Sequence, residues 1–158
     1  MRELTTIGIY GWTLQSFLTS LQEHGIALVI DIRQRRGVRG REYAWANAAR
    51  LQAALLDARI EYRHHKELAP TTELRRLQYR EDAALGVAKR NRARLAPEYR
   101  RRYAREVLDR ADLRRLTIER SAALLCVERE PEACHRSLAA EGLAREHGFR
   151  VVHLLPQE

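Results

Sequence analysis

The chain has 158 residues, of which 45% are hydrophobic, 32% charged and 6% aromatic, and it contains two cysteines. These values exclude a disordered tail and a small disulfide-rich domain, and they favour one α/β-sized domain over residues 1–158. The 27 Arg and 2 Lys residues outnumber the 21 acidic residues, and the net charge of +8 favours a polyanionic partner.

Two apolar segments with a helix between them open the chain. The β-branched run at residues 4–9 predicts a strand that ends in a turn at Gly11. Thr13 is a suitable N-cap for an amphipathic helix that stops at Gly25. The continuous apolar run at residues 26–32 then predicts a strand covered on both faces.

The alternation of strand and helix continues to the end of the chain. Further helices are predicted at residues 47–58, 73–115 (two helices, the second starting at Pro97) and 134–147, and further strands at 60–64, 122–127 and 151–155. Five strands alternating with helices predict a single Rossmann-like three-layer α/β domain with a mainly parallel sheet. An Arg-rich helical segment is inserted in it, and a ligand crevice is expected at the carboxyl ends of the strands.

No apolar run approaches the ~20 residues of a membrane helix, and the start of the chain lacks the pattern of a secretory signal. We therefore expect a cytoplasmic protein with reduced cysteines and no membrane partner. No cofactor is expected.

Positive charge is concentrated in two segments. Residues 75–115 contain 14 basic and 6 acidic residues and so carry the whole surplus. The loop at residues 33–41 has five arginines and no acidic residue. Because guanidinium groups bind phosphate oxygens bidentately, we expect these segments to contact nucleic acid or a phosphorylated small molecule. The residues expected to make these contacts are Arg33, Arg36, Arg39, Lys89, Arg90 and Arg92.

The basic helical segment also has a simpler explanation, as a solvated face with salt-bridging acids. Within it, Tyr99, Tyr103 and Val107 recur at a spacing of four residues. Such a stripe is more typical of a helix core than of a platform for stacking bases.

Polar residues gather where the first three predicted strands end. Gly8 allows close backbone approach, although such a glycine is usually only part of a turn. Asp31 and Arg33 are two residues apart and therefore share a face, either as a ligand site or as a structural ion pair. His64 is a candidate acid or base, and Glu67 follows it as a candidate ligand contact.

The richest cluster lies near the C-terminus, where a strand leads into a helix. Cys126, Glu128, Cys134, His135 and Arg136 surround this junction. A helix start favours anions and lowers thiol pKa values, so Cys134 is a candidate nucleophile. Cys126 is more typical of a small apolar residue in a buried strand.

Spacing tests three more specific mechanisms. A cysteine-dependent phosphatase is excluded, because the positions six residues after the two cysteines hold Glu132 and Ala140. Three potential zinc ligands at an unusual spacing predict no metal site. Adjacent helical side chains diverge by roughly 100°, so Cys134 is not expected to pair with His135. His64 or His65 is the expected partner instead.

Several of these segments together resemble a known family. They are Thr6-Ile7-Gly8, Asp31-Ile32-Arg33, Tyr62 with His64, Glu67-Leu68, and Leu125-Cys126-Val127-Glu128 followed by Pro131 and Cys134-His135-Arg136. This set resembles the family called domain of unknown function 488 (DUF488). Residues 43–51, 68–71 and 89–92 are similar to one bacterial subgroup of it.

The resemblance implies a Rossmann-like fold and an activity that is not settled. It also implies site positions, namely Asp31, Arg33, His64, Glu67, Cys126, Glu128, Cys134, His135 and Arg136. This chain departs from the family pattern at Ile9, where many members have histidine, and at Ala69-Pro70, where they have glycines.

Three functional hypotheses follow. The first is a protein that binds or processes nucleic acid or nucleotides. In it Arg33 and Arg136 hold anionic groups, Asp31 and Glu128 orient groups or exchange protons, and His64 is the acid or base. The second is a cytosolic enzyme that acts on a small anionic metabolite with Cys134 or His64. The third is an oligomeric scaffold that meets acidic proteins.

Overall fold

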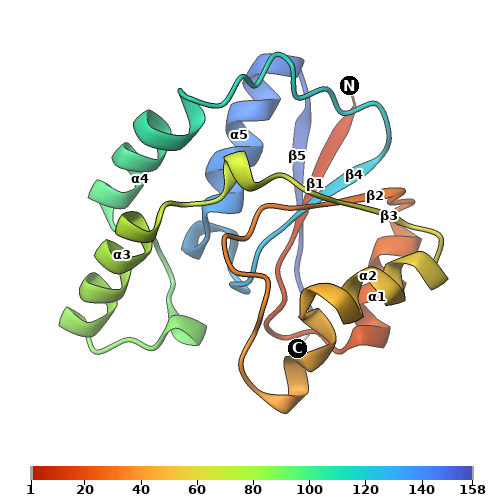
Figure 1. The fold of residues 1–158 in the computed structure, drawn as a ribbon, viewed down its shortest axis with the longest axis horizontal. Coiled ribbons are helices and arrows are strands. Elements are labelled where there is room, and N and C mark those ends of the chain that lie inside the picture. The colour runs from red at the N-terminus through yellow and green to blue at the C-terminus, as the bar shows by residue number, and fades with distance from the viewer. Residues whose placement is uncertain (1, 158) are drawn as a thin grey trace.

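The computed structural model describes residues 2–157 and contains a parallel five-stranded sheet between two layers of helices (Figure 1). The elements in chain order are β1 (Glu3–Ile7), α1 (Leu14–Glu23), β2 (Leu28–Asp31), α2 (Ala48–Asp57), β3 (Glu61–His64), α3 (Thr72–Ala84), α4 (Pro97–Tyr103), β4 (Ala122–Leu125), α5 (His135–His147) and β5 (Arg150–Leu154). The predicted Rossmann-like three-layer α/β fold is confirmed, with a sheet that is parallel throughout.

Alternating side chains of the strands build two hydrophobic clusters, one on each face of the sheet. In β2, Leu28 and Ile30 belong to the cluster under α3, α4 and α5. Val29, between them, belongs to the cluster under α1 and α2. Figure 1 shows the corresponding separation of the helices, with α1 and α2 at lower right and α4 and α5 at upper left. The sheet is therefore covered on both faces, as its apolar strands predict.

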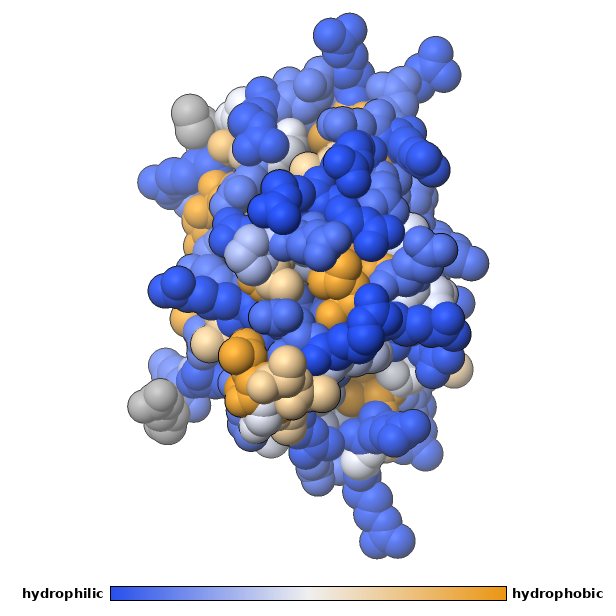
Figure 2. Space-filling view, turned by 90° about the vertical axis from the view of Figure 1, so that its left-hand side faces the viewer, coloured by the Kyte–Doolittle hydropathy of each residue, from blue (hydrophilic) through white to orange (hydrophobic). Residues whose placement is uncertain are grey.

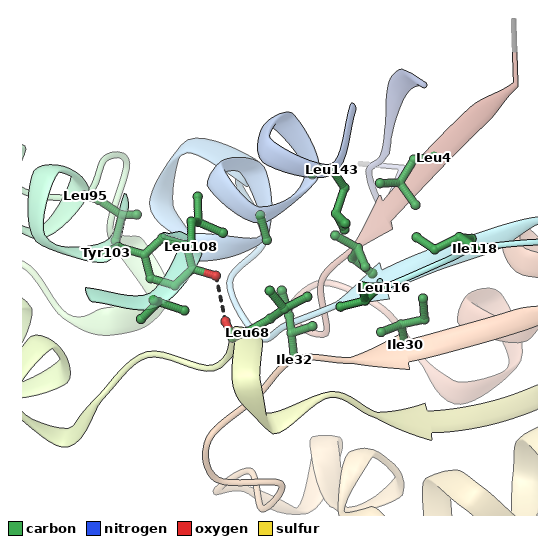
Figure 3. Close-up of a cluster of buried hydrophobic side chains, with 14 of the residues drawn as sticks. Leu4, Ile30, Ile32, Leu68, Leu95, Tyr103, Leu108, Leu116, Ile118 and Leu143 are labelled. Carbon is green, nitrogen blue, oxygen red and sulfur yellow. Dashed lines mark hydrogen bonds between the residues drawn. The ribbon is translucent and has the colours of Figure 1, made fainter. Parts of the chain in front are cut away.

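The Arg-rich segment is anchored by its apolar side. Tyr99 and Tyr103 are buried, their rings stack at 6.2 Å, and the Tyr103 hydroxyl donates a 2.6 Å hydrogen bond to the carbonyl of Leu68. Figure 3 shows this bond beside Leu108 and Ile32. The prediction that the tyrosine stripe packs in the core is confirmed. Apart from the buried Arg92 and the cavity-lining Arg75 and Arg90, the arginines of the segment are on its outer side. Figure 2 shows that this side of the molecule is mainly hydrophilic.

The helix ends match their sequence signals. Thr13 caps α1 by accepting a hydrogen bond from the Ser16 amide, and Gly148 ends α5 with a φ of 75°. The first strand is shorter than predicted. Pairing ends at Ile7, because the amide of Ile9 bonds to the carbonyl of Val127 in a loop. No helix within residues 2–157 has the length and apolar character needed to cross a membrane.

The strand order β3-β2-β4-β1-β5 places β2 and β4 side by side. The chain leaves β2 towards β3 at one edge of the sheet, and it leaves β4 towards β5 at the other edge. The two exits diverge, so a crevice forms between the carboxyl ends of β2 and β4, where open α/β sheets bind ligands.

Candidate functional site

A cavity of about 580 Å³ lies at this divergence point. Its walls come from the loops after β2 and β4, from α3, and from the segment between α3 and α4. Its volume is typical of sites for small molecules. The polar and sulfur-containing residues that line it are Tyr10, Arg33, Gln34, Arg35, Arg39, Arg75, Gln78, Tyr79, Lys89, Arg90, Arg92, Tyr99, Cys126, Glu128, Cys134 and His135.

Two cysteines, a histidine and a glutamate form the buried floor of the cavity. Nδ1 of His135 lies 3.4 Å from Sγ of Cys126 and 3.8 Å from Sγ of Cys134. Oε2 of Glu128 lies 3.6 Å from Sγ of Cys126. On its other side, Nε2 of His135 lies 2.8 Å from the carbonyl oxygen of Ile32 in the loop after β2. His135 thus connects the two strand ends.

The expectation that Cys134 and His135 point apart is wrong. It assumed that both residues are helical, but Cys134 is the N-cap of α5 and has extended angles, φ −136° and ψ 146°. The divergence of about 100° per residue applies only inside a helix. The expected partners lie elsewhere: Nε2–H of His64 donates to the carbonyl of Arg33, and His65 pairs with Glu67.

The floor groups shift one another's pKa values. Burial raises the pKa of Cys134, but hydrogen bonds from Cys126 and His135 and the positive charges of His135 and Arg136 bring it well below its usual value. Burial and the neighbouring Cys134 raise the pKa of Cys126. Burial raises the pKa of Glu128 as well, and Lys89 and Arg92 oppose this. The floor therefore favours a negative charge on Cys134.

Two lining arginines are structural. Arg33 is 2% exposed and bonds to Asp31 through Nε at 3.0 Å and through Nη2 at 2.9 Å. Arg92 bonds to Asp82 at 2.6 Å and to Glu128 at 3.2 Å. Buried guanidinium groups need such partners, since an unpaired buried charge is costly. These two residues hold the walls of the cavity together.

Three other cationic residues of the lining have no acidic partner among residues 2–157. Within residues 2–157, no carboxylate lies within 4.0 Å of the guanidinium groups of Arg35, Arg39 or Arg75. Among the described residues, Arg75 bonds only to neutral groups, the side chains of Gln34 and Tyr79. Lys89 is 3.8 Å from Glu128, the only acidic residue of residues 2–157 in the lining. The upper part of the cavity is therefore electropositive.

Arg90 closes one side of the rim. Its guanidinium lies 5.3 Å from the ring centres of both Tyr10 and Tyr43, and it pairs with Glu42 at 2.9 Å. It also donates to the carbonyl of Arg39. Arg90 thus ties the loop after β2 to the segment after α3.

Several residues predicted for the site lie behind the cavity or outside it. Asp31 is fully buried and accepts a further 2.6 Å hydrogen bond from Tyr62. Arg36 bonds to the Tyr62 hydroxyl, and Glu67 is exposed beside His65. None of these acidic or basic groups is among the lining residues. Of the two hypotheses for Asp31 and Arg33, a ligand site or a structural ion pair, the structure contains the buried ion pair.

Gly8 and Arg136 support the site from below. A Cβ at Gly8 would lie 2.0 Å from the carbonyl oxygen of Glu128, so only glycine permits the two loops to approach this closely. Arg136 has no exposed surface and donates to the carbonyls of Glu128 and Arg129 at 2.5 and 3.0 Å. Both residues fix the position of Glu128.

Part of the site is not evident from residue type alone. By its type Cys126 is more typical of a buried strand, but its spacing of two from Glu128 indicates a shared face, and the family resemblance also implies it as a site position. Arg75 and Tyr79 share one side of α3 and contact each other at 3.0 Å, a spacing of four that could have been noticed. Nothing in the sequence indicates that α3 approaches the end of β4.

Comparisons with known proteins complete this description. A family model described as "Domain of unknown function DUF488" matches residues 13–143. No curated protein matches the chain, and neither does any solved structure.

Proposed function

We propose that the cavity between β2 and β4 binds a small phosphorylated molecule of nucleotide size. The chain belongs to the family of domains of unknown function DUF488. The observation that carries this proposal is the set of unpaired cations, Arg35, Arg39 and Arg75, around a cavity with one acidic lining residue. Guanidinium forks bind phosphate oxygens bidentately, as they bind carboxylates.

The depth of the cavity supports a small ligand. A volume of about 580 Å³ lies within the range of roughly 300–1,000 Å³ that is usual for small-molecule sites. The unpaired cations stand at its rim, and Cys134, His135 and Glu128 lie at its floor. In this proposal the three arginines at the rim bind the phosphate. Cys134, His135 and Glu128 at the floor contact the rest of the ligand.

The predicted catalytic residues then divide into two groups. Glu128, Cys134 and His135 line the cavity and are the groups proposed to touch the ligand. Asp31 and His64 both bond to Arg33, through its side chain and its carbonyl oxygen respectively. We assign them a positioning role, because they fix the wall from which the loop at residues 34–39 extends.

Nucleic acid is a second candidate partner, favoured by the outer side of the Arg-rich segment. Seven exposed arginines of the segment have no carboxylate within 4.0 Å among residues 2–157, namely Arg76, Arg80, Arg94, Arg100, Arg101, Arg105 and Arg110. In this candidate function, a nucleic-acid strand lies across this hydrophilic face (Figure 2). Such binding would weaken steeply with salt, because phosphate contacts release counterions.

Calorimetric titration separates the two candidates. The ligands are pyrophosphate, a set of nucleoside monophosphates and triphosphates, and single-stranded DNA and RNA oligonucleotides, at about 50 mM and about 200 mM salt. We expect one small-molecule site per chain. Arg75→Ala is expected to weaken it about tenfold, in line with the loss of one charge-assisted hydrogen bond.

Arg76→Ala is the matched control, because Arg76 is the next residue of α3 and is exposed outside the cavity. If Arg76→Ala weakens binding as much as Arg75→Ala, and only oligonucleotides bind, nucleic acid on the outer face is the function. Binding of neither class would refute both candidates.

A further inference from the structure

We propose that Cys126, Cys134 and His135 bind one transition-metal ion of the zinc class at the floor of the cavity, with Glu128 beside the open coordination position. The three donor atoms lie within 4.8 Å of one another. This inference goes beyond the proposed binding of a phosphorylated molecule and does not depend on it. It reverses the expectation of no metal site, which rested on spacing along the chain and not in space.

The separations of the His135 ring nitrogen from the two sulfurs match tetrahedral coordination. Metal–sulfur and metal–nitrogen distances of about 2.3 and 2.0 Å in a tetrahedron imply donor separations of about 3.5–3.8 Å. The His135 Nδ1 atom lies 3.4 and 3.8 Å from the two sulfurs. Oε2 of Glu128 lies 3.6 Å from the Cys126 sulfur. The two sulfurs lie within 4.8 Å of each other, so an ion would fit once the cysteine side chains rotate to close around it.

The orientation of His135 is that of a metal ligand. The carbonyl of Ile32 can only accept a hydrogen bond, so the Nε2 atom 2.8 Å away carries a proton. In the neutral ring this leaves the lone pair on Nδ1, which faces both sulfurs. Ligating histidines usually hold their second nitrogen in this way, by donation to a carbonyl or a carboxylate.

The electropositive surroundings do not oppose a dication. A dication that displaces two protons from the set formed by Cys126, Cys134 and His135 leaves the net charge of the site unchanged. Arg136, fully buried behind the floor, has no carboxylate within 4.0 Å among residues 2–157, so it supports the two thiolates. Two sulfurs and one imidazole also favour zinc over magnesium or calcium, which prefer oxygen ligands.

The fourth position would face the cavity. Oε1 of Glu128 is held by Arg92 and Lys89, while Oε2 points towards the Cys126 sulfur. All four groups belong to the lining of the cavity. Three protein ligands and one position open to a ligand oxygen are the arrangement of catalytic zinc sites, in contrast to closed structural ones.

Cobalt absorption tests the site directly. The full-length chain is reduced, treated with a chelator under anaerobic conditions and titrated with Co²⁺ alone, followed by Zn²⁺. We expect one equivalent of Co²⁺ to produce intense d–d bands of tetrahedral cobalt and a sulfur-to-cobalt charge-transfer band. Zn²⁺ should remove both sets of bands.

Matched variants locate the ligands. Cys126→Ser and Cys134→Ser should each lower the affinity for Co²⁺ by more than the roughly 10–100-fold seen when an outer-shell partner is lost. His153→Gln is the control, since His153 bonds to Thr6 on the far side of Arg136 and lies outside the cavity. Arg75→Ala should bind Co²⁺ like the parent chain, so loss of phosphate binding and loss of metal binding are distinguishable.

Three results would overturn the site. These are the absence of a charge-transfer band in the parent chain, an octahedral spectrum, or full Co²⁺ affinity in both cysteine variants. If the variants do not fold, as judged by circular dichroism, the spectrum of the parent chain still decides, because the charge-transfer band requires cobalt–sulfur bonds. A parent chain that binds no Co²⁺ while both thiols titrate as free would leave Cys134 as a nucleophile and not a ligand.

Discussion

The ends of β2 and β4 lie side by side, and each carries two polar residues spaced two apart, Asp31 with Arg33 and Cys126 with Glu128. The two pairs differ in how their side chains are bonded. After β2, the carboxylate of Asp31 is saturated by the backbone and side chain of Arg33 and by the Tyr62 hydroxyl. After β4, the Cys126 sulfur lies 3.4 Å from His135 and 3.6 Å from Glu128, and one oxygen of Glu128 is held by Arg92 at 3.2 Å while the other makes only this long contact to Cys126 among residues 2–157. The same two-residue spacing therefore produces a closed structural pair in one strand and an open floor in the next.

The arginines repeat this contrast. Arg33 and Arg92 are buried and paired with carboxylates, so their charge stabilises the fold. Arg35 and Arg39 are exposed at the rim without such partners among residues 2–157. What separates a structural residue from a candidate site residue is whether its polar atoms are satisfied within the protein.

Asp31→Asn should have the largest effect, because it breaks the closed pair. It removes the charge opposite the buried Arg33 guanidinium, and we expect a loss of about 3–5 kcal/mol of stability in urea unfolding. Asp57→Asn, at the exposed end of α2, is the control and should change stability little. A loss for Asp31→Asn no larger than that of the control would contradict a structural role for the pair.

Gly8→Ala tests the packing that supports the open floor. The added methyl group would lie 2.0 Å from the carbonyl oxygen of Glu128, so the loops must separate. We expect a loss of about 1–3 kcal/mol in the same unfolding assay. Gly37→Ala, where the nearest atom is 3.7 Å away, is the control. Equal losses in the two variants would show that the close approach of the loops is not required.

Arg35→Ala combined with Arg39→Ala sharpens the contrast between the two kinds of arginine. Anion affinity should fall by about a hundredfold or more, since each of the two lost charge-assisted hydrogen bonds contributes about 1.5–3 kcal/mol. Unfolding in urea should change by less than about 0.5 kcal/mol. Arg50→Ala, on the exposed side of α2, should alter neither quantity. A double variant that loses stability but retains anion affinity would reverse the assignment.

The smallest expected effect is the pH dependence of stability that His153, near the buried Arg136, contributes. Burial and the nearby Arg136 lower the pKa of His153 in the folded state. The unfolded chain therefore takes up the proton first, and stability that is present above about pH 6.5 is lost as the pH falls through the folded pKa. His153→Gln should reduce the loss of stability between about pH 7.5 and about pH 5. An identical loss in variant and parent would show that folding does not lower the pKa of His153.

The sequence predicted the order and type of the main elements because their apolar periodicities are strong. Alternation also predicted the shared face of Asp31 and Arg33. The sequence did not indicate that β4 lies between β2 and β1, and this insertion brings His135 within 2.8 Å of the carbonyl of Ile32. Strand order depends on the packing of the whole sheet, which no local pattern encodes.

The errors at the site have local causes. The pairing of Cys134 with His135 depends on the extended backbone of an N-cap, one residue before helical geometry begins. The role of α3 depends on its docking, which brings Arg92 to both Asp82 and Glu128. Charge counts located the basic segments correctly but could not separate paired arginines from unpaired ones, because pairing is a tertiary property.

A crystal structure of the full-length chain with pyrophosphate or a nucleoside monophosphate tests the central claim most directly. The account predicts density for the anion within hydrogen-bonding distance of Arg35, Arg39 or Arg75, above the sulfur of Cys134. An empty cavity at saturating ligand, or an anion bound only to the outer arginines of the α3–α4 segment, would contradict it.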